Sequence, residues 1–352
     1  MTEYAWFGAL CDDDYEFLGV PDATLRSSWS HCREIVRRAE TNGFDNVLLP
    51  SGYTLGIDST AFASAIAVET SRIKLLLAVR LGELVVPQLA RQIATLQQIA
   101  GGRLVINAIS SDLPGETMPS DDRYQRTTES IAILRALLAG KRVDFDGRFV
   151  SARIDPPRIA VDAPHDPVIY FGGLSEAARE CAAQSCDIYL MWPDTTAQMS
   201  HVMREMNGRA AKHGRSLRYG WRSHVIVRET ESQARAAAER LVSRLDAQTG
   251  ASIRAKSLDS QSAGVARQSE LRESADADGY IERHLWTGVG RARSGAGIAI
   301  VGDPDQVTTK IREIRDAGVD TFILSGYPHL AECDLFARLV LPQLRADEAR
   351  VA

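Results

Sequence analysis

The chain has 352 residues, of which 45% are hydrophobic and 25% are charged, an ordinary composition for a soluble globular enzyme. A formal net charge of −5 provides no strong basic field and argues against a nucleic-acid partner. No apolar run approaches the length of a membrane span, and the start MTEYAWFGAL lacks the pattern of a signal peptide. The five cysteines are scattered without a CxxC pair, which is typical of a reducing compartment. We therefore expect a cytoplasmic protein.

Short apolar runs alternate with amphipathic helical segments along the chain. Eight of these runs are predicted strands, at residues 4–10, 45–49, 73–79, 104–109, 168–171, 187–191, 222–227 and 321–324. Helix signals lie between them: Asn42-Gly43 closes the first helix, and Asp303-Pro304 opens a late one with an N-cap and a first-turn proline. Eight strand–helix units predict an α/β fold, a TIM (β/α)8 barrel with insertions, in a single domain over residues 1–352.

Two segments interrupt this rhythm. Residues 143–154 are predicted to form a β-hairpin that turns at Asp146-Gly147. Residues 250–297 form a long polar insertion, which we interpret as a mobile lid, with a surface insertion of no function as the alternative. Four glycines near its end are candidate hinges: Gly288, Gly290, Gly295 and Gly297.

Polar and aromatic residues follow several predicted strands, at the face where TIM barrels carry their active sites. The segment from Asn107 to Ser111 offers an amide and hydroxyls to a heteroaromatic ring, or else ordinary turn chemistry. The segment GGLSE at 172–176 leads into a helix, and a helix N-terminus suits a phosphate, although glycine turns before helices are common. Trp192 either walls a pocket or packs under a loop.

Basic side chains gather in two places. Arg222 and His224 lie two residues apart on a predicted strand and so share one face. Burying both favours an anionic ligand or a flanking carboxylate, with a satisfied structural pair as the alternative. We expect His224 beside Arg222 to be neutral near pH 7. Arg291 and Arg293, at the end of the insertion, either close over an anionic substrate or remain solvated.

The segment SGYPH at 325–329 follows the last predicted strand. Tyr327 and His329 are candidates for proton transfer, although His329 also suits the first turn of a terminal helix. The remaining histidines show no metal-ligand spacing, so no metal site is expected.

Taken in order, the segments FGGLSEAA, YLMWPD, RSHVIVRET, LWTGVGRARSGAGIAIVGD and FILSGYPHL resemble the alkanesulfonate monooxygenases of the bacterial-luciferase superfamily. Earlier segments such as FDNVLLPSGYT and VDFDGRF also resemble that family, so the resemblance covers nearly the whole chain. It implies a two-component, FMNH2- and O2-dependent monooxygenase that splits an alkanesulfonate into an aldehyde and sulfite. It also implies a separate NAD(P)H-dependent flavin reductase as partner, and we expect a homo-oligomer, dimer or tetramer.

The same resemblance implies roles for individual residues. It assigns catalytic roles to Arg222, His224, Arg293, Tyr327 and His329, flavin contacts to Asn107, Gly173, Leu174, Ser175 and Trp192, and a mobile lid to 250–297. On this interpretation Arg293 adds its charge to the site only when the lid closes.

The sequence departs from the family after the second predicted strand. Where the family usually has Thr-Gly-Arg-Ser-Cys, this chain has SGYTL at 51–55, so Tyr53 replaces the arginine and Leu55 the cysteine. Both are expected to shape the substrate pocket, and a leucine cannot hydrogen-bond. The alternatives to an alkanesulfonate substrate are the same flavin chemistry on another small organic molecule, a hydride-transferring deazaflavin oxidoreductase, and a flavin-binding protein without turnover.

Overall fold

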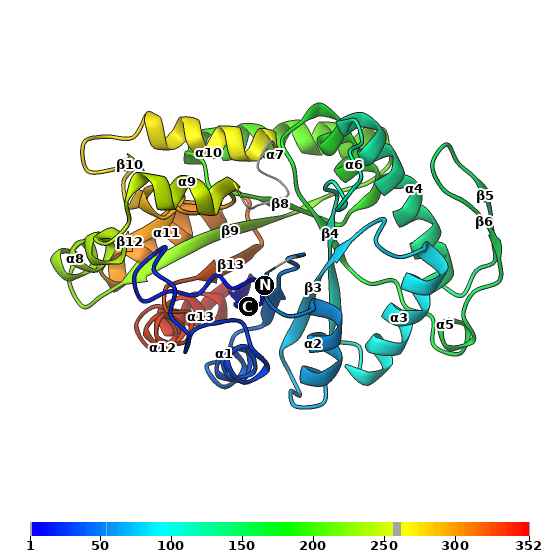
Figure 1. Ribbon diagram of the computed structural model, residues 1–352, viewed down its shortest axis with the longest axis horizontal. Helices are drawn as coiled ribbons and strands as arrows, with labels where there is room; N and C mark the ends of the chain where they lie inside the picture. The colour runs from blue at the N-terminus through cyan, green and yellow to red at the C-terminus, as the bar shows by residue number, and fades with distance from the viewer. Residues whose placement is uncertain (1, 54, 256–261, 352) are drawn as a thin grey trace.

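A closed barrel of eight parallel strands forms the centre of the computed structural model, which describes residues 2–53, 55–255 and 262–351 (Figure 1). Its strands follow one another in the order β9-β13-β1-β2-β3-β4-β7-β8, and β8 pairs back with β9. Their bounds are β1 (Glu3–Phe7), β2 (Asn46–Leu49), β3 (Lys74–Arg80), β4 (Leu104–Ile109), β7 (Ile169–Phe171), β8 (Ile188–Met191), β9 (Arg218–Val227) and β13 (Thr321–Ser325). The predicted TIM barrel is confirmed, with each predicted strand in place.

Helices surround the barrel, as Figure 1 shows. They are α1 (Trp29–Thr41), α2 (Ser59–Ile66), α3 (Val86–Ile99), α4 (Ser120–Leu138), α5 (Arg158–Asp162), α6 (Glu176–Ser185), α7 (Thr196–Lys212), α8 (Glu231–Val242), α11 (Pro304–Asp316), α12 (His329–Leu339) and α13 (Leu341–Val351). Their ends follow the predicted signals: α1 ends at Asn42, followed by Gly43 at φ +82°, and Asp303 and Gln306 form a capping box on α11. No helix in the described part of the chain is long and apolar enough to cross a bilayer.

The barrel interior is filled by side chains that point inward from the strands. They form one buried cluster of Ala5, Phe7, Leu48, Leu76, Val105, Tyr170, Ile188 and Ile323. Since side chains alternate along a strand, the next inward positions toward the carboxyl ends include Asn107 on β4 and Arg222 on β9. The filling of the barrel therefore changes from apolar to polar at its carboxyl end.

Strand β9 is longer than predicted and carries two sets of neighbours. Its first part pairs with β8 and β13, while its second part pairs with β12 (Ala299–Gly302), where Ala299 is the partner of His224. Strand β12 was not predicted as a separate element, because four residues after a glycine-rich stretch show no clear period. This extra parallel partner holds the insertion against the barrel.

The insertion is folded wherever the structure describes it; residues 256–261 lie outside the described residues. It contains α9 (Ala247–Ala255), α10 (Ala263–Glu273), β10 (Tyr280–Glu282), β11 (Leu285–Trp286) and a 3-10 turn at Gly288–Arg291. The antiparallel strands β10 and β11 extend the barrel sheet beyond β12. A Cβ atom on Gly288 would lie 2.0 Å from Trp286, and one on Gly297 would lie 2.6 Å from Gly290. These glycines allow close packing, and their role as hinges stays a prediction.

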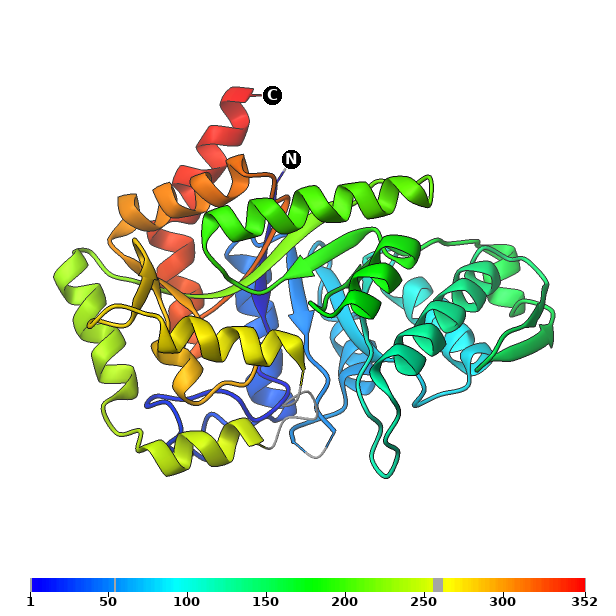
Figure 2. The ribbon, with the colours of Figure 1, turned by 90° about the horizontal axis from the view of Figure 1, so that it is seen from above.

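The predicted hairpin is present as β5 (Val143–Asp146) and β6 (Ser151–Ile154). Its loop is longer than a turn at Asp146-Gly147, because the carboxylate of Glu129 accepts hydrogen bonds from the backbone N–H groups of Arg148, Phe149 and Val150. Figure 2 shows the two chain termini at the same end of the molecule.

Candidate active site

A cavity of about 680 Å³ opens at the carboxyl ends of β4, β7 and β8. The residues predicted to contact flavin all line it: Asn107, Gly173, Leu174, Ser175 and Trp192. Ile109 and Met199 add apolar surface, and Ser110 adds a hydroxyl that Thr127 contacts at 2.9 Å. Such a mixture of apolar walls and a few polar groups is typical of a cofactor pocket.

One end of this cavity offers groups that suit a phosphate. Ser175 caps α6 by accepting a hydrogen bond from the backbone N–H of Ala178, so the positive end of the helix dipole faces the cavity. Gly173, at φ +152°, has no room for a Cβ, which would lie 2.6 Å from Ala178. Arg123 and Arg179 also line the cavity, and the buried Nε of each has no hydrogen-bond partner.

Helix α10 of the insertion covers the cavity. The guanidinium of Arg267 bonds both carboxylate oxygens of Asp194 at 2.7 and 2.9 Å, and Gln268 donates to the carbonyl of Pro193 at 2.7 Å. Gly264 lies so close to Trp192 that a Cβ there would be 2.9 Å from the indole ring. The position of the insertion agrees with a lid, and its mobility stays a prediction. Arg267 and Gln268 were missed, because they lie in a polar stretch of sequence without a clear apolar period.

Arg222 is buried without an anionic partner. Its Nη1 donates to the backbone carbonyl of Ser223 at 2.6 Å, its guanidinium lies 4.3 Å from the ring centre of Phe7, and its Nη2 has no partner. Among the described residues no carboxylate pairs with it. Burial, and then the charge of Arg293, lower the pKa of Arg222 to about 9. A bound anion would offset both effects.

His224 shares the inward face of β9 with Arg222, as predicted, and its two ring nitrogens are both engaged. Nε2 lies 3.1 Å from the carbonyl of Ala296, which can only accept, so Nε2 carries the proton. Nδ1 lies 2.8 Å from the hydroxyl of Ser325. Burial, and then the charge of Arg222, hold the pKa of His224 well below its usual range. The ring is therefore neutral, as expected, and its lone pair is occupied.

Arg293 already lies inside the site in this structure. It pairs with Asp13 at 2.6 Å, and its guanidinium lies 5.8 Å from the ring centre of Phe7. Burial lowers the pKa of Arg293, but Tyr327 and Asp13 outweigh burial and raise it. We had expected this charge to arrive only on closure and had not singled out Asp13. Arg291 is exposed and donates to the carbonyl of Leu245 at 3.1 Å instead.

Tyr327 and His329 complete this group, which we call the basic cluster: Arg222, His224, Arg293, Tyr327 and His329. The Tyr327 ring stacks on His224 and meets His329 edge-on, with 5.1 Å between ring centres in each pair. Its hydroxyl is buried without a partner, and burial raises its pKa. His329 is both the first residue of α12 and a fully buried member of the cluster, so its two predicted roles coexist.

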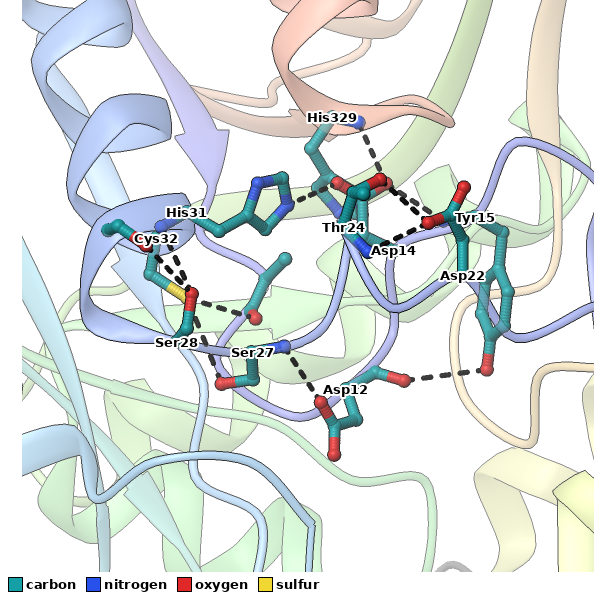
Figure 3. A network of polar contacts seen from close by, with 12 residues as sticks. Asp12, Asp14, Tyr15, Asp22, Thr24, Ser27, Ser28, His31, Cys32 and His329 are labelled. Carbon is teal, nitrogen blue, oxygen red and sulfur yellow. Dashed lines mark hydrogen bonds and ion pairs between the residues drawn. The ribbon is translucent and has the colours of Figure 1, made fainter.

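Asp14, which the sequence did not single out, orients His329 (Figure 3). One oxygen of Asp14 accepts from both the backbone N–H and Nδ1 of His329 at 2.9 Å. Since a carboxylate only accepts, Nδ1 carries a proton and Nε2 is the basic nitrogen of the ring. Nε2 is buried and has no partner. His329 is therefore the histidine of the cluster with a free lone pair.

Tyr53 and Leu55, the predicted residues of the substrate pocket, do not line the large cavity. Their exposures are 56% and 40%, and Tyr53 lines a second cavity of about 340 Å³ beside the buried Arg80. Thr54 between them lies outside the described residues. A thiol does reach this loop from elsewhere, because a Cβ on Gly52 would lie 3.2 Å from Sγ of Cys11. Burial, and then Asp13, raise the pKa of Cys11, so the thiol is protonated.

The chain is similar to known proteins in both sequence and structure. Two relatives are sulfoquinovose monooxygenases. The one from Novosphingobium aromaticivorans is 59% identical, over an alignment that covers 97% of this chain and 96% of the relative. The one from Agrobacterium fabrum is 48% identical, over an alignment that covers 98% of this chain and 90% of the relative. The solved structure of riboflavin lyase with modified FMN and riboflavin superimposes with a TM-score of 0.81 at 16% identity, covering 99% of this chain and 92% of that one. No group of three or more metal-binding side chains occurs in the described ranges. The model of the luciferase-like monooxygenases matches residues 17–321, and the chain belongs to that family.

Proposed function

We propose that this protein is an FMNH2- and O2-dependent monooxygenase that releases sulfite from a sulfonated sugar of the sulfoquinovose class. The buried Arg222 carries this proposal, because its Nη2 has no partner and no carboxylate compensates its charge in the described structure. A sulfonate is an anion that can accept from Arg222, Arg293 and Tyr327 together. The two sulfoquinovose monooxygenase relatives support a sugar sulfonate rather than the simple alkanesulfonate expected from the sequence.

The atom balance defines what the site must do. A group R–CH2–SO3⁻, with O2 and two electrons and two protons from the reduced flavin, becomes R–CHO, hydrogen sulfite and water. The carbon loses one hydrogen as it becomes the aldehyde carbon, so a base must lie near it. Nε2 of His329 is suited to this task because its lone pair is free, whereas both nitrogens of His224 are engaged. Arg222 and Arg293 stabilise the negative charge of the departing sulfite.

The large cavity fits the flavin. Its apolar walls and Trp192 suit the flat ring system, Asn107 offers an amide to the ring edge, and the start of α6 with Arg123 and Arg179 suits the phosphate. Reduced flavin, when bound, supplies the electrons that activate oxygen. Strand pairing places Met191 of the cavity wall beside Trp221, the residue before Arg222, so cofactor and anion subsites adjoin. We further propose a separate NAD(P)H-dependent reductase as the source of reduced flavin.

The test is a reaction with chemically reduced FMN and oxygen, in which sulfite and the aldehyde product are measured separately. Sulfoquinovose should release sulfite faster than a simple alkanesulfonate such as octanesulfonate. Anaerobic fluorescence titration should show tighter binding of FMNH2 than of FMN. Binding of a reduced deazaflavin with none of FMNH2, or product without sulfite, would contradict the proposal.

A further inference from the structure

His31 and His329 both contact the carboxylate of Asp14 (Figure 3). Nε2 of His31, on the first turn of α1, lies 2.8 Å from one oxygen of Asp14, and Nδ1 of His329 lies 2.9 Å from the other. The side chains of Asp14 and His329 are fully buried, whereas 11% of the His31 side chain is exposed. Two imidazoles, one at the surface and one in the site, thus share one carboxylate.

The shared carboxylate is ionised. Burial alone would raise the pKa of Asp14, but its electrostatic interaction with His329 and the hydrogen bonds from His31 and His329 outweigh burial and lower it strongly. Because an ionised carboxylate only accepts, each ring directs an N–H group at it. The basic nitrogens that remain are Nε2 of His329 in the interior and Nδ1 of His31 near the surface.

One negative charge cannot fully compensate two imidazolium ions. Positive charge on one ring therefore competes with positive charge on the other for the shared carboxylate. We propose that His31 is a positioning residue that sets the basicity of His329 in the active site, by competing with it for the charge of Asp14. The proposal rests on the proposed function only for the role of His329 as a base.

The surroundings give Asp14 this influence. The ring of His329 contacts the rings of Phe7 and Tyr327, and Tyr327 in turn stacks on His224. The guanidinium groups of Arg222 and Arg293 both lie over the ring of Phe7. Both arginines and His329 therefore contact the same phenyl ring. Among the described residues, Asp14 is the carboxylate that contacts the rings of His31 and His329. The neighbouring carboxylate, Asp13, pairs with Arg293 instead. The charge of Asp14 thus acts against a cationic background.

Two substitutions of His31 separate this role from simple packing. His31→Gln keeps an N–H donor for Asp14 but never carries charge, so His329 should hold its proton to higher pH. His31→Lys places a permanent charge on Asp14, so His329 should lose its proton at lower pH. The acid limb of the pH profile of kcat/KM should therefore lie higher in the Gln variant than in the Lys variant by about one pH unit or more, with the wild type between them.

Nitrogen NMR of the histidine rings provides a second measurement that needs neither flavin nor substrate. The titration midpoint of Nε2 of His329 should separate in the same order in the two variants. His213, which pairs with Glu180 at 2.6 Å on the surface, is the matched control, and the same two substitutions there should leave both measurements unchanged. Coinciding midpoints and coinciding acid limbs in the His31 variants would overturn the proposal. Separated midpoints without sulfite release from any variant would contradict the proposed function alone.

Discussion

The large cavity and the basic cluster lie side by side at one end of the barrel, yet their polar groups differ in how fully they are satisfied. Around the cavity, Ser175, Asp194 and Gln268 have protein partners. Arg123 and Arg179 each pair with a carboxylate there, although the Nε atom of each has no partner. In the cluster, atoms of Arg222, Tyr327 and His329 are buried without partners. Buried polar atoms without partners cost free energy, so the cluster is organised for a ligand that brings charge and acceptors. In the cavity the charges of Arg123 and Arg179 are compensated by protein carboxylates, whereas in the cluster the charge of Arg222 is not.

The sharpest test of this difference is Arg222→Met, which keeps most of the volume and removes the charge. Sulfite release should fall roughly 10²–10³-fold, as for removal of one preorganised donor, while FMNH2 binding should change little. Steady-state kinetics and anaerobic titration measure the two effects. Arg218→Ala, an exposed arginine at the start of the same strand, serves as the control. Equal losses in turnover and in flavin binding would remove the distinction between the two regions.

Arg293 tests whether the cluster also supports the fold. Arg293→Ala leaves Asp13 buried without its ion pair, so the free energy of unfolding should drop by about 3 kcal/mol, the low end for a buried pair because some solvent contact remains. Adding Asp13→Asn should recover most of that loss in urea unfolding. The coupling of flavin oxidation to sulfite release should not recover. Both variants should therefore still form hydrogen peroxide at the expense of sulfite. Full coupling in the double variant would show that the charge of Arg293 serves stability alone.

The neutral state of His224 predicts a pH dependence that the cavity residues lack. Because the folded pKa of His224 is lowered, the unfolded chain binds its proton more readily below about pH 6.5, and stability should fall with acidification. The expected slope is about 1.4 kcal/mol per pH unit for this one group. His224→Gln should flatten the curve between pH 6.5 and 5.5 in urea unfolding, and His213→Gln should not. An unchanged slope would mean that His224 is protonated in the folded protein.

The smallest effect concerns the cover of the cavity. Arg267→Ala removes a half-exposed ion pair with Asp194, worth roughly 0.2–1 kcal/mol, so hydrogen exchange over α10 should speed up no more than about fivefold. Bound FMNH2 should restore much of the protection if α10 is a lid. Arg158→Ala, which breaks an exposed pair on α5, gives the matched control. Exchange that is equally slow with and without flavin in both proteins would count against a mobile cover.

The sequence by itself determined the barrel. Alternating apolar runs and helices located each barrel strand, and the two-residue period placed Arg222 and His224 on one face, because local periodicity reflects which side a segment buries. Motif resemblance predicted that Tyr327, His329 and the turn from Gly173 to Ser175 belong to the same site. Each of these features depends on a short stretch of consecutive residues, so it can be recognised without knowing what the stretch contacts in the folded protein.

Only the tertiary structure decided which groups complete the site. Asp13 pairs with Arg293 across 280 positions, and Asp14 reaches His329 across 315, so neither contact leaves a local pattern. The structure also shows which histidine has an unoccupied ring nitrogen. The carbonyl of Ala296 and the hydroxyl of Ser325 engage both nitrogens of His224, whereas Nε2 of His329 has no partner. Hydrogen bonds between distant segments depend on how the chain closes into a barrel, and closure brings together residues that no periodicity relates.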